Sequence, residues 1–252
     1  MPKSLFIVGV LLSGASAPKA PAAPPGGEVG DWELLSQEDG IEVWRADVEG
    51  SPLMTFLGRG LVHESLEDVF TVIGDLDGRC RWQSQCAHSR TIRRISRDEL
   101  IGYYRIKGRA LASPRDTVFR ARLDFFPSKG TIEINFREVL FPGEGPQDGV
   151  VRMPTLRGFW RLKKLRPRVI EVTYQVQADP GGWLPNWLFN LASKALPYFA
   201  ILNLRDFVAQ GDFGSSAEKA AYHRPQGFAD FRAMEPGLSA SKLPPPHLKP
   251  AK

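Results

Sequence analysis

The chain has 252 residues, of which 42% are hydrophobic and 24% are charged, and this balance favours an ordinary globular protein over a disordered one. Lysine and arginine outnumber aspartate and glutamate by 33 to 28, which gives a formal charge of +5. An excess this small does not indicate a nucleic-acid-binding protein, and we expect no nucleic acid among the partners.

The N-terminal segment has the composition of a secretory signal peptide. Lys3 provides a positive charge, Ser4 to Leu12 is nearly all apolar, and Ala15-Ser16-Ala17 offers the small residues of a cleavage site. The apolar stretch is too short to cross a bilayer, which takes about 20 helical residues. We therefore expect a signal peptide at residues 1–17 and a Pro/Ala/Gly linker at residues 18–30. The protein is then exported, to the periplasm or the extracellular space.

The chain has two cysteines, Cys80 and Cys86. In an exported protein the compartment permits a disulfide between them, and two reduced cysteines are the alternative. With nearby His88 they would give only three metal ligands at no recognised spacing, so we expect no metal site.

After the linker, the first elements are short. Trp32 to Leu35 fits either a helix or a strand, and extended runs follow at residues 41–45 and 53–62. A helix is predicted over residues 65–73, because apolar residues recur there at spacings of three and four. Ser65 stands at its N-cap, with acidic residues in the first turn.

A long series of strands and one long helix complete the predicted fold. Alternating runs occupy residues 101–107, 116–125, 131–139, 149–153, 156–165 and 169–178, and turn signals separate them. Short connections of this kind join antiparallel neighbours. From Leu184 to Gln210 the apolar residues form a helical stripe, which Pro197 should kink. We predict one α+β domain at residues 31–212, a curved antiparallel sheet around a long C-terminal helix, followed by a disordered tail at residues 213–252.

Four segments in this order resemble the START lipid-transfer domain. They are Asp75 to Trp82, Ser113-Pro114-Arg115-Asp116, Val151-Arg152-Met153 and the run from Asp179 to Leu188. The resemblance covers roughly residues 31–210. It implies a helix-grip fold whose internal tunnel takes up one sterol, phospholipid, fatty acid or similar lipid.

The resemblance also implies which side chains line the tunnel. From the strands and the C-terminal helix we select Tyr103, Arg105, Phe119, Ala121, Ile134, Trp160, Leu188, Leu191, Ala192, Ala195, Phe199 and Asn203. Aligned on Arg115-Asp116 without gaps, Arg105 falls where several animal members have an acidic residue. We hypothesise that Arg105 faces the cavity and meets an acidic ligand group or a wall carboxylate. The alternative is a one-residue slip that turns it to solvent, since strands reverse faces on such a slip.

No nucleophile elbow, HExxH, CxxC or phosphate loop is present, so we expect no catalytic residues and no cofactor. The leading interpretation is a monomeric lipid carrier or sensor that contacts membranes transiently through Trp183, Trp187 and Phe189. One alternative is a helix-grip cyclase or hydrolase that acts in the same cavity through Tyr103, Arg105 and Asn203. The other is an envelope interaction module whose cavity is filled by side chains.

Overall fold

The computed structural model describes residues 29–108, 112–183 and 194–211. The strands are β1 (Glu33–Glu38), β2 (Ile41–Ala46), β3 (Thr55–Val62), β4 (Cys86–Arg94), β5 (Glu99–Ile106), β6 (Arg115–Phe126), β7 (Thr131–Glu138), β8 (Val151–Arg152), β9 (Thr155–Arg166) and β10 (Val169–Asp179). The α-helices are α1 (Leu66–Gly74) and α3 (Leu196–Ala209), and the short 3₁₀-helices are η1 (Arg79–Arg81) and η2 (Pro127–Lys129).

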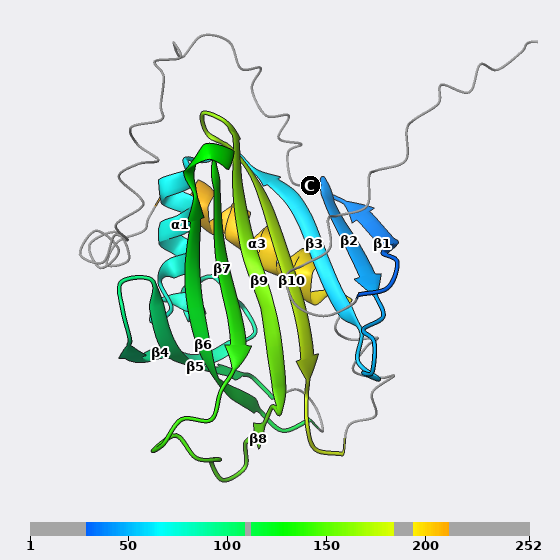
Figure 1. The fold of residues 1–252 in the computed structure, drawn as a ribbon, viewed down its shortest axis with the longest axis vertical. Helices are drawn as coiled ribbons and strands as arrows, with labels where there is room; N and C mark the ends of the chain where they lie inside the picture. Colours follow the sequence, from blue (N-terminus) through cyan, green and yellow to red (C-terminus); the bar gives the residue numbers. More distant parts are fainter. Residues whose placement is uncertain (1–28, 109–111, 184–193, 212–252) are drawn as a thin grey trace, which may run out of the picture.

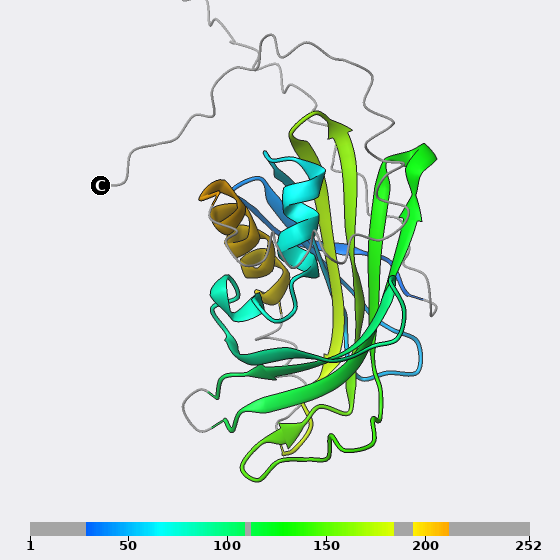
Figure 2. The same cartoon turned by 90° about the vertical axis from the view of Figure 1, so that its left-hand side faces the viewer.

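The strands form one sheet in the order β1-β2-β3-β10-β9-β7-β6-β5-β4, and β8 pairs in parallel with β6 off this path. Apart from β8, neighbouring strands are antiparallel. The sheet curves, and both helices lie on the same side of it (Figures 1 and 2). This arrangement confirms the predicted α+β helix-grip fold. None of the helices in the described ranges has the length and apolar character needed to span a bilayer.

Helix α1 forms where the sequence predicts it. The Ser65 side chain accepts a hydrogen bond from the backbone N–H of Asp68 at 3.0 Å, which satisfies one of the free donors of the first turn. Leu66, Val69 and Ile73 recur on one face and are buried in the main core cluster. The core therefore continues from the sheet through α1 to α3, whose Ile201 belongs to the same cluster.

Helix α3 packs directly on the backbone of β3. A Cβ atom placed on Gly58 would lie 2.8 Å from the Cβ of Pro197, and one on Gly60 would lie 3.3 Å from Cγ2 of Ile201. Only glycine lets the helix approach the strand backbone so closely, so Gly58 and Gly60 determine where α3 packs on β3. Ile201 and Leu204 are fully buried there.

One strand was not predicted, and one expectation about the elements was wrong. Strand β4 was not predicted because this edge strand is mostly polar, with two exposed arginines at its end and two register shifts against β5. Pro197 does not kink α3, since it stands in the first turn, where a proline removes no intrahelical hydrogen bond. The expected signal peptide, the linker up to residue 28, the segment 184–193 and the tail lie outside the described residues.

Candidate functional site

A cavity of about 720 Å³ lies between the concave face of the sheet and the layer formed by α1, η1 and α3. This volume is within the range of small-molecule sites, roughly 300–1,000 Å³. The sheet supplies most of the apolar wall, through Leu100, Phe119, Leu123, Ile134, Phe136, Leu156, Trp160, Tyr174 and Val176. Leu196, Phe199 and Ala200 of α3 face this wall from the other side.

Aromatic rings form the part of the wall that β7, β9 and β10 provide. Trp160 stacks on Tyr174 with ring centroids 4.2 Å apart, and Tyr174 stacks in turn with Phe136 at 6.3 Å. Buried Trp82, which follows η1, meets Trp160 edge-on at 6.1 Å. Rings packed against one another have few accessible rotamers, so this part of the wall presents a fixed apolar surface to a bound ligand.

Arg79 is one of several basic residues that line the cavity, and it lies deep, between the end of α1 and the ring of Trp82. The other basic residues of the lining are Arg94, Arg97, Lys107, Arg115 and Arg122. The Nη2 atom of Arg79 donates to the carbonyl oxygen of Ile73 at 2.5 Å, and its guanidinium lies 5.4 Å from the Trp82 ring centroid. Its Nε is buried without a hydrogen-bond acceptor, and Arg79 forms no ion pair within residues 29–108, 112–183 and 194–211. Burial lowers the pKa of Arg79, although Tyr104, Tyr174 and Asp75 favour its charged form. An arginine nevertheless stays protonated, so a positive charge stands in an apolar cavity.

Two tyrosines stand close to this cation. The Tyr104 hydroxyl donates to Oε1 of Gln83 at 2.8 Å, and burial raises the pKa of Tyr104 to about 12. Burial also raises the pKa of Tyr174, against the opposing effect of Arg79. Both phenols are therefore neutral at physiological pH, and neither provides a counter-charge for Arg79.

The cavity closed by a C-terminal helix is the arrangement implied by the sequence resemblance. The sequence profile of the START domain family matches residues 25–209. The chain belongs to the START domain family.

The proteins that resemble this chain include bacterial and animal ones. An uncharacterized protein of Pseudomonas aeruginosa is 29% identical over 176 residues, which is 69% of this chain and 85% of that protein. The phosphatidylcholine transfer protein of Mus musculus is 26% identical over 182 residues, 71% of this chain and 82% of its own length. The structure of a STAR-related lipid transfer protein from Xanthomonas axonopodis matches with a TM-score of 0.65 at 29% identity, over 71% of this chain and 98% of that one.

Several residues selected from the START resemblance lie in the cavity wall. They are Phe119, Ala121, Ile134, Trp160, Ala195, Phe199 and Asn203. Leu188, Leu191 and Ala192 lie outside the described residues. Sequence reasoning missed Arg79, Tyr104 and Tyr174. A signal for Arg79 existed, because it stands inside the Asp75–Trp82 segment that carried part of the resemblance.

The placement of Tyr103 and Arg105 in the cavity was wrong. Their neighbours Tyr104 and Ile106 line it, so the inward face of β5 is shifted by one residue from the predicted one. Tyr103 instead lies in a second buried cluster with Ile101 and Val118. This is the slip left open for Arg105, and the cavity is lined by other cations, among them Arg79.

Two START-like sequence segments meet on the face of β6 turned away from the cavity. Asp116 is fully buried, and its carboxylate accepts bonds from Arg152 Nε at 2.7 Å and Arg152 Nη2 at 3.1 Å. The Tyr103 hydroxyl donates to the same carboxylate at 3.0 Å, and burial together with this bond raises the pKa of Tyr103 to about 12. Asp116 therefore pairs with Arg152 and not with adjacent Arg115, whose side chain lines the cavity.

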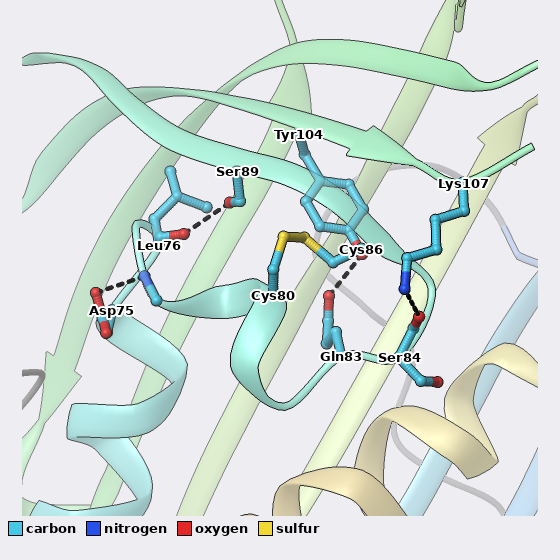
Figure 3. The surroundings of a disulfide bond; sticks show 10 residues. Asp75, Leu76, Cys80, Gln83, Ser84, Cys86, Ser89, Tyr104 and Lys107 are labelled. Atoms are coloured by element: carbon cyan, nitrogen blue, oxygen red, sulfur yellow. Dashed lines mark hydrogen bonds between the residues drawn. A yellow bond between two sulfur atoms is a disulfide. The ribbon is translucent and has the colours of Figure 1, made fainter. Parts of the chain in front are cut away.

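Cys80 and Cys86 form a disulfide, which decides between the two alternatives left by the sequence. The bond joins η1 to the first residue of β4, beside the cavity (Figure 3). Within the described ranges, no three His, Cys, Asp or Glu side chains are grouped as metal ligands would be.

Proposed function

We propose that the protein binds one lipid molecule in the cavity and carries it between membranes without altering it. The observation that carries this proposal is an apolar cavity of about 720 Å³ under the C-terminal helix of a START domain. A lipid that buries on the order of 400 Å² of apolar surface gains about 10 kcal/mol before immobilisation costs. Binding of this strength needs few polar contacts, as the largely apolar wall provides.

The ligand class that best suits the wall is a phospholipid. Within the described part of the chain, Arg79 forms no ion pair with Asp75, the carboxylate of the same cavity that favours its charged form, and its Nε has no acceptor. A phosphate would supply that acceptor and a counter-charge in direct contact with the guanidinium. The Gln83, Tyr104 and Asn203 side chains add polar groups to the same cavity. The mouse relative named for phosphatidylcholine transfer supports this choice over a sterol or a fatty acid.

We place the entrance near the start of α3. Phe199 lines the cavity and is still 44% exposed, and Trp183, three residues after cavity-lining Pro180, is 74% exposed. Large exposed aromatic side chains favour the interface of a bilayer. The monomer would therefore contact the membrane transiently at this end when it takes up or releases its lipid.

A carrier is favoured over an enzyme because the groups expected for a helix-grip cyclase or hydrolase do not converge. Of Tyr103, Arg105 and Asn203, only Asn203 belongs to the cavity wall. Its Nδ2 lies 3.5 Å from Oγ of Ser84, and neither group is a strong acid or base.

We propose further that the protein is exported. The apolar N-terminal stretch with its small-residue site and the Cys80–Cys86 disulfide support the same oxidising compartment. N-terminal sequencing of the protein isolated from its native cell envelope should begin at Pro18. Retention of Met1 in the soluble cell fraction would reject export.

The test of lipid binding is native mass spectrometry of the purified protein, followed by organic extraction. One co-purified phospholipid per chain is the expected result. If the purified protein contains no lipid and takes up no phospholipid, sterol or fatty acid from vesicles, the proposal is rejected and the interaction module with a cavity filled by side chains is favoured.

A further inference from the structure

The Cys80–Cys86 disulfide closes a short ring of residues at the edge of the cavity. The bond spans six positions of sequence, and its Cα atoms are 4.9 Å apart. The ring begins in η1, passes buried Trp82 and ends at the first residue of β4. Figure 3 shows it between β5 and the helices.

This ring is part of the cavity wall. Three of its residues, Gln83, Ser84 and Gln85, line the cavity, and Arg79 immediately precedes the ring. The position of the disulfide therefore determines where these polar groups stand relative to a bound lipid.

Toward the sheet, the ring is held by good hydrogen bonds to β5 and the residue after it. Gln83 accepts from the Tyr104 hydroxyl at 2.8 Å, while Lys107 donates through Nζ to the Ser84 carbonyl and through its backbone N–H to the Gln85 carbonyl, both at 2.9 Å (Figure 3). These bonds hold one side of the ring against β5, which is paired with β4 and β6 on its two edges.

Toward α3, the contacts are of a weaker kind. Asn203 Nδ2 lies 3.5 Å from Ser84 Oγ, at the outer limit of a hydrogen bond, and the Arg81 guanidinium lies 5.2 Å from the Phe207 ring centroid. The hydrogen bond that joins the ring to α3 is therefore longer than those that join it to β5.

We propose that the disulfide is a positioning element of the lipid site, which holds residues 83–85 against β5 and slows lipid exchange past the boundary with α3. The inference rests on the proposed lipid carriage. Without the covalent bond, the segment between Trp82 and β4 gains conformational freedom, and its bonds to β5 open more often. Release then becomes faster, while the sheet and the core beneath α3 stay folded.

The bond is accessible to a reductant from outside. Cys80 is exposed, whereas Cys86 is buried, so a thiolate attacks at the Cys80 sulfur. Dithiothreitol supplies two electrons and two protons: the S–S bond breaks, two thiols form, and the reagent becomes a cyclic disulfide.

The experiment loads the full chain with a phosphatidylcholine that carries a fluorescent acyl chain and follows its release to acceptor vesicles. We compare three forms of the protein: oxidised, reduced after loading, and the Cys80→Ser/Cys86→Ser variant. Circular dichroism verifies that each form is folded. We expect the reduced protein and the double variant to release the lipid about tenfold faster than the oxidised protein, which corresponds to a release barrier lower by about 1.4 kcal/mol. The dithiothreitol-treated double variant is the control, because the reagent has no bond to cleave in it.

Equal release rates in oxidised and reduced protein would overturn the proposal. If no form takes up the fluorescent lipid, the proposed function fails instead. If the double variant does not fold, the test is hydrogen exchange of the backbone amides of residues 81–86 in oxidised and in reduced wild-type protein. Exchange rates that do not increase on reduction would count against the positioning role.

Discussion

Replacement of Arg79 by methionine tests the assignment of the polar end of the cavity. Methionine keeps the unbranched stem of the side chain as far as the position of Nε and removes the charge. The variant loses the bond from the charged guanidinium to the Ile73 carbonyl, worth about 1.5–3 kcal/mol, and the contact with the Trp82 ring, worth about 0.5–2 kcal/mol. Against this, removal of an unpaired buried charge gains about 1–4 kcal/mol. The terms offset, so we expect the free energy of unfolding to change by less than about 2 kcal/mol.

Binding should respond differently. A hydrogen bond from a charged donor to phosphate is worth about 1.5–3 kcal/mol, so Arg79→Met should weaken phospholipid binding by about 10- to 150-fold. A diacylglycerol has the same acyl chains but no phosphate, and its affinity should stay within about threefold of the wild-type value, since about 0.6 kcal/mol of apolar contact is all that changes.

The assay is displacement of a fluorescent lipid by phosphatidylcholine or diacylglycerol, with Arg105→Met as the matched control. Arg105 stands on the same sheet but outside the cavity wall, and its variant should bind both lipids as the wild type does. If Arg79→Met loses affinity for both lipids equally, or Arg105→Met alone loses phosphatidylcholine, the reasoning is refuted.

Three further outcomes are expected. Asp116→Asn should lower the free energy of unfolding by about 1.5–3 kcal/mol in urea titration, because it removes the charge of a fully buried carboxylate that partly buried Arg152 contacts. Asp124→Asn breaks the more exposed pair with Arg122 and should cost less than about 1 kcal/mol. Equal effects of the two substitutions would contradict the assignment. Ala121→Trp should place an indole ring in the path of the acyl chains, so native mass spectra of a folded variant should show less bound lipid than those of the wild-type protein. Tyr103 and Tyr104 have raised pKa values of about 12, so they hold their protons more tightly in the folded state than in the unfolded state. Their contribution to stability should therefore be complete below about pH 10 and should decline as the pH rises toward about 12. Urea midpoints that do not fall across this range, or that fall equally in a Tyr103→Phe/Tyr104→Phe variant, would contradict this.

The sequence predicted the elements whose pattern reflects one buried face. Helix α1 has a single apolar stripe and a serine N-cap, and it forms within one residue of the expected bounds. Strands β6, β7, β9 and β10 are long and alternate clearly, and they form close to the predicted ranges. Here local pattern and tertiary burial agree, which is the condition for a prediction from a single sequence.

The face of β5 could not be predicted in this way, because β5 is covered on both sides. Ile101 and Tyr103 are buried in the outer cluster, while Leu100 and Tyr104 line the cavity. Where both sets of alternate residues are apolar or aromatic, period-2 alternation does not decide which set faces inward. The gapless alignment then placed Arg105 inside by a shift of one residue.

Arg79 was missed for a different reason. It belongs to η1, a single short turn between α1 and β4, where no periodicity relates a residue to a face. Its direction depends on tertiary contacts, the Ile73 carbonyl at the end of α1 and the ring of Trp82. Neither partner can be inferred from the spacing of residues 73, 79 and 82.

The two sides of the cavity are held together by different means, and this difference bears on how a lipid could leave. The sheet side consists of paired strands, and opening it would break ladder hydrogen bonds between β5, β6, β7 and β9. The other side consists of α1, of α3, seated by apolar contact on Gly58 and Gly60, and of the disulfide-closed ring. The bond between Asn203 and Ser84, which joins α3 to the ring, is long, whereas separation of strands exposes unpaired backbone groups, each costing about 1–3 kcal/mol. Under the proposed lipid carriage, a lipid would therefore leave between α3 and the ring, and the aromatic wall on β7, β9 and β10 would stay in place.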